Sequence, residues 1–139
     1  MIVILILSLL NYGQDPIQWD VKFETGVIKF NAIIEQDWHL YAAYVPNPND
    51  GPLPTLFSFK ANEKYSLIDS IIQQIPIIKY DKNFGVEIAY YEHEATFFQK
   101  IKLVDKTAIA KGNINYMTCN ETTCIPFNFP FEIKLNFQD

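Results

Sequence analysis

The sequence predicts an all-β protein, built as an antiparallel sandwich or a small barrel. Aromatic residues make up 15% of the chain and stand among many Ile and Val residues, a composition that favours strands over helices. Short runs of alternating apolar and polar residues are separated by turn residues. No segment of helical length repeats its apolar residues every 3.6 positions. We therefore expect about eight to ten short strands in one domain.

The first half of the chain contains four expected strands and a proline-rich loop. The strands are expected at residues 17–24, 27–35, 38–44 and 55–60. Thr25 and Gly26 form a turn between the first two strands. The segment VPNPNDGPLP contains four prolines, which neither a helix nor a central strand accommodates. We expect it to be an ordered loop that passes over an edge of the sandwich.

The second half contains four further expected strands, at residues 86–92, 95–104, 107–119 and 124–137. Residues 65–78 could begin a helix by periodicity, but Pro76 and the isoleucines favour a strand or an irregular edge. The segment YDKNFG, from Tyr80 to Gly85, is expected to be a polar loop that carries two aromatic residues. The chain contains no internal repeat, which agrees with a single domain.

The first residues have the pattern of a secretory signal peptide. Ile2–Leu10 form a mainly apolar run, too short for a membrane-spanning helix of about 20 residues. The small residue Gly13 precedes a plausible cleavage site, although no Lys or Arg precedes the run, and a buried strand is the alternative. We expect a signal peptide at residues 1–14 and, at residues 15–139, a periplasmic or otherwise exported domain without a membrane span of its own.

The charge of the chain excludes several classes of ligand. The formal net charge is −5, and all 11 basic residues are Lys. An acidic chain without Arg is poorly suited to bind phosphate groups or nucleic acids. Neither a P-loop nor the dinucleotide fingerprint GxGxxG occurs. We expect no cofactor and no nucleic-acid partner.

The two cysteines, Cys119 and Cys124, stand at the ends of two expected strands with NETT as the connecting turn. A tight hairpin brings strand ends within disulfide distance, but so small a ring contributes only about 2 kcal/mol to stability. A metal site lacks ligands, because His39 and His93 are remote from the pair in sequence, and we expect no metal. A cysteine nucleophile with a histidine base would leave the second cysteine unused. A structural staple and a working redox couple both remain open.

Five segments, in order, resemble the N-terminal periplasmic domain of the thiol:disulfide interchange protein DsbD, over about residues 15–137. The segments are DPIQWDVKFE, AIIEQDWHLYA, GPLPTLFSF, IIKYDKNFGVEIAYYE and GNINYMTCNETTCIPF. The last is the cysteine hairpin, which in relatives ends in C-x-P-P. In this chain Pro126 is followed by Phe127, a departure that we expect to alter packing alone.

The resemblance implies an immunoglobulin-like β-sandwich that reduces disulfides by exchange. Its electrons would come from a thioredoxin-like donor domain and pass to oxidised periplasmic client proteins. Cys119 and Cys124 match the exchanging pair, and we favour Cys124 as the residue that attacks first. The family's membrane helices and thioredoxin-like domain have no counterpart before Asp139. We therefore expect the donor in another protein, unless the chain is a fragment.

The resemblance also implies which residues surround the cysteines. Tyr80, Asp81 and Phe84 match a cap loop that shields the pair and opens for partners. His39 and Tyr41 match positions close to the pair. Without the resemblance, plain packing is the better explanation for Phe84 and Tyr41, and a hydrogen-bonded core histidine is the better explanation for His39.

Two further expectations concern chemistry and an alternative function. Glu121 inside the hairpin turn, together with Asp81, is expected to give the thiols an ordinary or raised pKa, because acidic neighbours disfavour a thiolate. His93, between Glu92 and Glu94, is expected to be a solvated turn residue. The alternative function is a non-enzymatic β-sandwich binding module in which the disulfide only holds a recognition hairpin.

Overall fold

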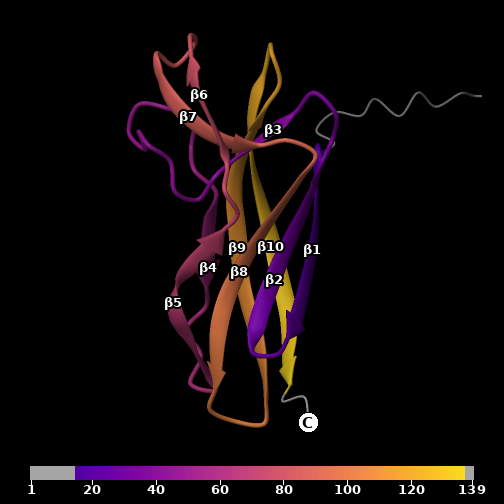
Figure 1. Cartoon of the computed structure of the whole chain (residues 1–139). Coiled ribbons are helices and arrows are strands. Elements are labelled where there is room, and N and C mark those ends of the chain that lie inside the picture. Colours follow the sequence, from indigo (N-terminus) through magenta and orange to yellow (C-terminus); the bar gives the residue numbers. More distant parts are fainter. Residues whose placement is uncertain (1–14, 137–139) are drawn as a thin grey trace, which may run out of the picture.

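The computed structural model describes residues 15–136, and within them every regular element is a β-strand (Figure 1). The strands are β1 (Ile17–Glu24), β2 (Val27–Ile34), β3 (His39–Tyr41), β4 (Leu56–Phe59), β5 (Tyr65–Gln73), β6 (Ile77–Asp81), β7 (Val86–Tyr91), β8 (Glu94–Leu103), β9 (Thr107–Cys119) and β10 (Cys124–Asn136). Across this part of the chain, no helix is long and apolar enough to cross a membrane. The predicted signal peptide at residues 1–14 lies outside the described residues.

The strands form two sheets in which every pairing is antiparallel. The smaller sheet has the order β1-β2-β8-β5. The larger sheet has the order β10-β9-β3-β7-β6, and β4 pairs with β9 beyond the end of β3. This arrangement is the immunoglobulin-like antiparallel β-sandwich that the family resemblance implied, and it decides between the sandwich and the barrel that the strand pattern left open.

The first hairpin shows how local sequence sets the strand pairing. Thr25 and Gly26, which connect β1 to β2, both have positive φ angles, of 52° and 76°. A two-residue connection with both residues in the left-handed region matches the right-handed twist of the paired strands. The predicted turn at Thr25 and Gly26 is therefore confirmed.

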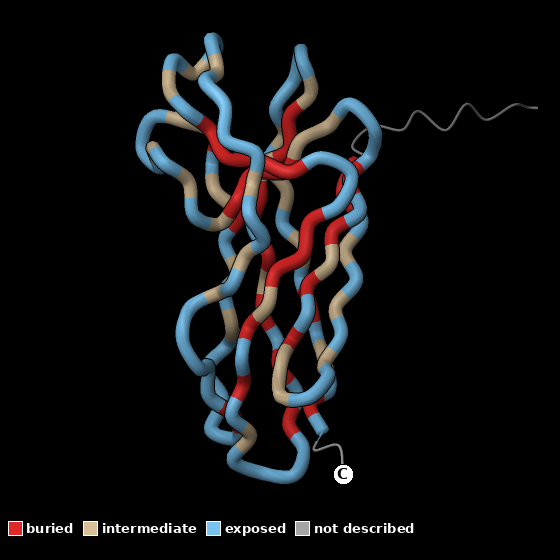
Figure 2. The backbone as a smooth tube through the Cα atoms, in the orientation of Figure 1, coloured by how far each residue is buried: buried red, intermediate tan, exposed pale blue. Residues whose placement is uncertain are grey.

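The core lies between the two sheets and is rich in aromatic side chains. Phe30 of β2 and Phe97 of β8 are fully buried on one side, and Leu40 and Ile114 of the larger sheet on the other. The Phe30 ring lies 4.8 Å from the Phe57 ring and 5.1 Å from the Phe131 ring, centre to centre. Figure 2 shows the buried residues as stretches along the inner strands. The aromatic composition of the chain thus fills the space between the sheets.

Three predicted elements differ from the structure in their limits. The strand expected at residues 38–44 is shorter, because the Ala43 and Tyr44 amides donate hydrogen bonds to the Gln73 side chain instead of continuing a ladder. Residues 65–78 contribute to β5 and β6, which belong to different sheets and are separated at Pro76. In the expected loop at Tyr80–Gly85, the first two residues belong to β6, and the turn covers residues 82–85.

Candidate functional site

The two cysteines form a disulfide at the end of the β9–β10 hairpin. Cys119 is the last residue of β9 and lies directly opposite Cys124, the first residue of β10, with their Cα atoms 4.1 Å apart. The turn between them is held by Asn120, whose side-chain oxygen accepts hydrogen bonds from the backbone amides of Thr122 and Thr123. Asn favours such local bonds, so the sequence itself closes this turn. The hairpin therefore aligns the two sulfurs without help from distant elements.

The two residues of the disulfide differ in exposure. Cys119 is only 4% exposed, whereas Cys124 is exposed at the tip. Pro126, which lies opposite Met117 on the neighbouring strand, is also exposed. A thiolate from another protein can therefore approach Cys124, while Cys119 is enclosed by its own domain. The two cysteines therefore differ in how far another protein can reach them.

Cys119 belongs to a second hydrophobic cluster, which is separate from the core. Its buried members are Tyr41, Ile88, Tyr90 and Cys119, with Val86 and Met117 packed against them. Tyr41 lies opposite Tyr90 in the sheet, whereas the next pair, Leu40 and Tyr91, belongs to the core. Because alternate residues of a strand point to opposite faces, the cluster lies on the face of the larger sheet that turns away from the core.

The proline-rich loop covers part of this outer face. The Asn47 side chain donates a hydrogen bond to the Glu87 carbonyl of β7. A Cβ atom at Gly51 would lie 3.6 Å from Val86 and 3.9 Å from Ile88, so the loop backbone passes close over these side chains. The loop that the prolines predicted therefore covers the β7 part of the cluster next to the disulfide.

His39 lies beside the disulfide in the same sheet. It is directly opposite Cys119 on β9, and the Thr118 hydroxyl donates a 2.8 Å hydrogen bond to its carbonyl oxygen. Its ring stacks on the Tyr90 ring with centres 4.2 Å apart. Its Nε2 lies 3.0 Å from a carboxylate oxygen of Glu92. The imidazole is thus held in place by the neighbouring strand.

The two tyrosines of the outer cluster remain protonated over the physiological range. Burial, followed by the charge of Asp81 and by Tyr90, raises the pKa of Tyr41 to about 12. Burial, followed by the charges of Glu92 and Asp81, raises the pKa of Tyr90. These hydroxyls can donate hydrogen bonds, but they do not serve as bases at neutral pH.

The residues matched to a cap belong to the β6–β7 hairpin, which rises at the same end of the molecule as the cysteine hairpin (Figure 1). Tyr80 is 59% exposed and lies opposite Glu87, on the other face of the sheet from Cys119. The Asp81 carboxylate accepts hydrogen bonds from the amides of Asn83 and Phe84 and so shapes the turn. Phe84 is half-buried. The hairpin places Asp81, but not Tyr80, on the face that carries the disulfide.

Sequence reasoning missed two neighbours of the disulfide, Tyr90 and Glu92. Both lie on the Cys119 side of the larger sheet, at the end of β7 and just after it. The signal was present in the period of two, because Val86, Ile88 and Tyr90 alternate along β7. His93 is exposed at the following turn, as predicted.

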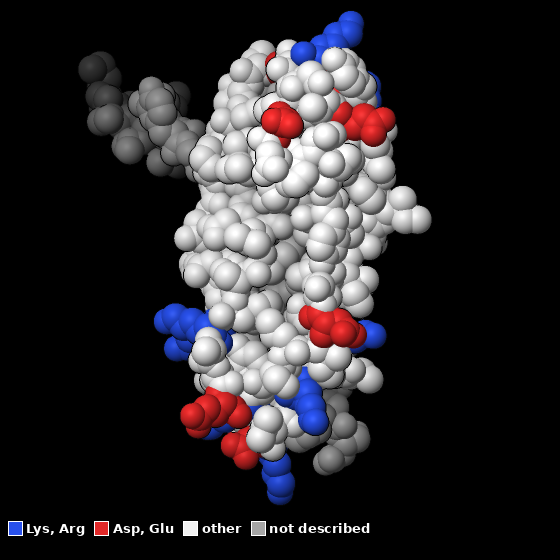
Figure 3. All heavy atoms as spheres, turned by 90° about the vertical axis from the view of Figure 1, so that its left-hand side faces the viewer, with Lys and Arg blue, Asp and Glu red and all other residues white. Residues whose placement is uncertain are grey.

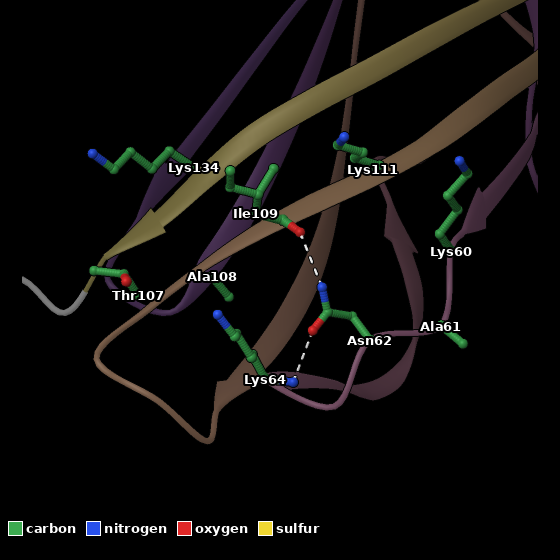
Figure 4. A pocket seen from close by; sticks show the side chains of 9 residues that line it. All are labelled: Lys60, Ala61, Asn62, Lys64, Thr107, Ala108, Ile109, Lys111 and Lys134. Atoms are coloured by element: carbon green, nitrogen blue, oxygen red, sulfur yellow. Dashed lines mark hydrogen bonds between the residues drawn. The ribbon is translucent and has the colours of Figure 1, made fainter.

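The far end of the molecule carries a lysine-lined hollow (Figure 4). Lys60, Lys64, Lys111 and Lys134 surround it, and Lys111 lies 3.9 Å from Glu132. The hollow and the disulfide lie at opposite ends of the paired strands β9 and β10. In residues 15–136 no group of three or more His, Cys, Asp or Glu side chains is arranged to hold a metal ion. The disulfide end is therefore the candidate site.

Comparison with known proteins agrees with this geometry. No curated protein sequence matches the chain. A solved structure, the DsbD N-terminal domain of Neisseria meningitidis in the reduced form, superposes with a TM-score of 0.65 and 18% sequence identity, covering 88% of this chain and 87% of that one. At this identity the likeness establishes the fold alone. Residues 8–134 match the family described as thiol:disulfide interchange protein DsbD, N-terminal, and the chain belongs to that family.

Proposed function

We propose that the chain is an exported thiol–disulfide exchange module, which takes electrons from a thioredoxin-like donor and passes them to oxidised client proteins. One observation carries the proposal: the Cys119–Cys124 disulfide stands at a hairpin tip with one exposed and one buried partner. Exchange needs a sulfur that an incoming thiolate can reach and a second sulfur that can leave and return. A structural bridge has no need of an exposed tip.

The exchange proceeds in two steps. A donor thiolate attacks Sγ of Cys124, the bond to Cys119 breaks, and the electron pair of that bond leaves with the Cys119 sulfur. The second donor thiol loses its proton and attacks the donor sulfur of the mixed disulfide, which releases Cys124 as a thiolate. Two electrons and two protons thereby pass from the donor dithiol to the pair. A client disulfide is reduced by the same steps in reverse, beginning with attack by Cys124.

The neighbouring residues are assigned supporting roles in this proposal. The turn that carries Phe84, next to Tyr80 and Asp81, acts as a cap that limits access of small thiols and oxidants. His39 and Tyr41 pack beside Cys119, which supports their assignment as site residues. Pro126 stiffens the exposed strand just after Cys124, because its ring fixes φ.

The surface formed by β5, β6 and the segment between them suits a protein partner. Several large apolar side chains on β5, β6 and the segment between them are exposed, and Ile75 is the most open, at 96%. Figure 3 shows that the middle of the face carrying these strands has no charged side chain. Exposed apolar surface of this kind marks contacts with proteins. It supports macromolecular donors and clients over small thiols.

The chain is proposed to act outside the cytosol, with residues 1–14 as its signal peptide and residues 15–139 as the exchange module. The Cys119–Cys124 disulfide supports this assignment, because reducing systems keep thiols free in the cytosol. N-terminal sequencing of the secreted protein tests the boundary. Recovery of a chain that still begins at Met1 would contradict it.

A redox titration of the purified domain tests the exchange function. We expect a midpoint potential that a periplasmic thioredoxin-like protein can reach, and rapid reduction of the pair by such a protein. A potential below about −300 mV is typical of a structural disulfide. That value, together with partner binding that Cys→Ser substitutions leave unchanged, would support the non-enzymatic binding module instead.

A further inference from the structure

Four side chains form a row across the outer face of the larger sheet. Cys124 of β10 lies opposite Cys119 of β9, and Cys119 lies opposite His39 of β3. On the other side of His39, its ring nitrogen meets the carboxylate of Glu92, just after β7. Directly opposite residues of an antiparallel pair have Cβ atoms about 5 Å apart and share a face. The row therefore places an imidazole between the buried cysteine and a carboxylate.

The imidazole is held in one orientation by two neighbouring side chains. Nε2 is engaged by Glu92, and the ring is stacked on Tyr90. A carboxylate at one ring nitrogen fixes the tautomer and leaves the other nitrogen, Nδ1, as the proton acceptor. A nucleophile, a base and a group that orients the base are the parts that an activated cysteine requires.

Cys119 needs such a partner more than Cys124 does. It is 4% exposed, so water reaches its sulfur poorly, and burial disfavours a thiolate. The titratable groups that face His39 are Tyr90 and Glu92 from β7 and its end, Cys119 from β9 and Tyr41 from its own strand. Asp81 of β6 acts on both tyrosines. Because the tyrosines retain their protons, the imidazole of His39 is the side chain in this set with one nitrogen that can donate a proton and one that can accept it.

We propose that His39, oriented by Glu92, gives a proton to the Cys119 sulfur when the disulfide is reduced and takes it back when the disulfide re-forms. The identity of the partners rests on the function proposed above, but the proton transfer does not. A thiolate attacks Sγ of Cys124, and the Cys119 sulfur leaves with the electron pair of the broken bond. The imidazolium donates its proton to that sulfur and becomes neutral. In the opposite direction, neutral His39 accepts the proton from Cys119, whose thiolate attacks Sγ of Cys124 in the mixed disulfide and expels the client thiolate.

The test compares His39→Asn with a matched control, His93→Asn. His93 is the second histidine of the chain and is exposed in a turn at φ 66°, a conformation that Asn tolerates. Each purified protein, with its disulfide formed, is reduced by dithiothreitol between pH 5 and 8, and the free thiols are trapped by rapid alkylation and counted by mass. The reverse reaction uses oxidised dithiothreitol, so that one reagent pair gives both rates and the equilibrium constant.

We expect His39→Asn to lower both rate constants at pH 6 by at least about tenfold, a threshold set below the roughly 100-fold or more that general acid–base assistance typically supplies. The equilibrium constant should stay the same, because proton transfer assists both directions equally. For the wild type, the logarithm of the reduction rate should rise with pH and then flatten as imidazolium is lost. His39→Asn should retain a slope near one, and His93→Asn should match the wild type.

A second variant separates chemistry from folding. Glu92→Gln keeps the imidazole and should lower the rates by a smaller factor while preserving the bend in the pH profile. Wild-type rates and pH profile in His39→Asn would overturn the proposal, as would a change in the equilibrium constant that accounts for the whole loss. If a thioredoxin-like donor fails to reduce the wild type while dithiothreitol reduces it with the expected bend, the proposed function fails and the role of His39 stands.

Discussion

At the scale of single residues, the unequal exposure of the two cysteines predicts which one is trapped with a partner. In Cys119→Ser, the exposed Cys124 can form a mixed disulfide with a donor, and no second thiol is present to resolve it. Cys124 of this variant is first converted to its mixed disulfide with 5-thio-2-nitrobenzoate, and the thiolate of a thioredoxin-like protein that lacks its own resolving cysteine then attacks Sγ of Cys124 and expels thionitrobenzoate. We expect the resulting covalent complex to accumulate. Non-reducing electrophoresis and intact mass detect the complex.

Cys124→Ser is the matched variant, because it leaves the buried Cys119 as the single thiol of the chain. We expect it to trap little or no donor under the same conditions and to lose turnover. Equal trapping by the two variants would show that Cys119 is as accessible as Cys124. Trapping by Cys124→Ser alone would reverse the assigned order of attack.

Tyr41 predicts a pH dependence of stability on the alkaline side. Burial and the neighbouring Asp81 and Tyr90 raise its pKa to about 12, whereas an unfolded tyrosine titrates near about 10. Because the folded pKa is the higher one, this stabilisation is complete below about pH 10 and is lost as pH rises toward about 12. The loss from Tyr41 amounts to about 3 kcal/mol at most, because each pKa unit corresponds to about 1.4 kcal/mol.

Urea unfolding at a series of pH values between about 9 and 11 measures this effect. We expect the unfolding free energy of Tyr41→Phe to fall less steeply with pH than that of the wild type. Tyr80→Phe, which alters an exposed residue, serves as the control and should follow the wild type. Parallel curves for Tyr41→Phe and the wild type would contradict the assignment.

Single residues also show where sequence reasoning stops. The pairing of Cys119 with Cys124 could be predicted, because a short turn fixes the register of its own hairpin. The contact between His39 and Glu92 could not, since 53 residues separate them in the chain. The contact between His39 and Glu92 depends on which strand pairs with β3, and the packing of the whole sheet determines that pairing.

At the scale of elements, the β6–β7 hairpin predicts a measurable shielding effect. If Phe84 caps the pair, Phe84→Ala should speed the reaction of the disulfide with glutathione by about threefold or more, because a lid that loses its bulk opens more readily. Phe98→Ala is the matched control, since Phe98 is also half-buried but lies on β8 opposite Lys29. Rates are followed by mass after rapid alkylation. Unchanged reactivity of Phe84→Ala would remove Phe84 from the cap.

The strands themselves were predicted well where the residues alternate over a long run. The limits of β1 and β9 agree with the sequence pattern, because each of these strands has one face on the core and one toward solvent. β3 was overestimated, since the amides after Tyr41 are satisfied by the side chain of Gln73. No local sequence pattern predicts a hydrogen bond between a backbone amide and a side chain 29 or 30 residues away.

At the scale of the whole molecule, composition and alternation sufficed for the fold class but not for the sheet order. β8 lies between β2 and β5, and β3 lies between β9 and β7. These neighbours come from distant parts of the chain, and many orders would bury the same apolar faces. The resemblance to a known family supplied the sandwich topology, which periodicity alone left open between a sandwich and a barrel.

The separation of the two hydrophobic clusters predicts that a change of redox state alters local stability at the disulfide end of the molecule only. Cys119 packs with Tyr41, Ile88 and Tyr90 on the outer face, whereas the core residues of β1, β2 and β8 lie between the sheets. We expect reduction to free the hairpin tip and loosen the outer cluster, and to leave the core packing intact. Amide exchange reports such local opening, because each cooperative unit has its own free energy of opening.

We therefore expect hydrogen exchange to become faster on reduction at residues 77–92 and 117–126 and to stay unchanged in β1, β2 and β8. Mass spectrometry of the oxidised and reduced forms measures these rates. A uniform rise across all strands would mean that the disulfide stabilises the whole sandwich, and the hairpin would then be a structural staple.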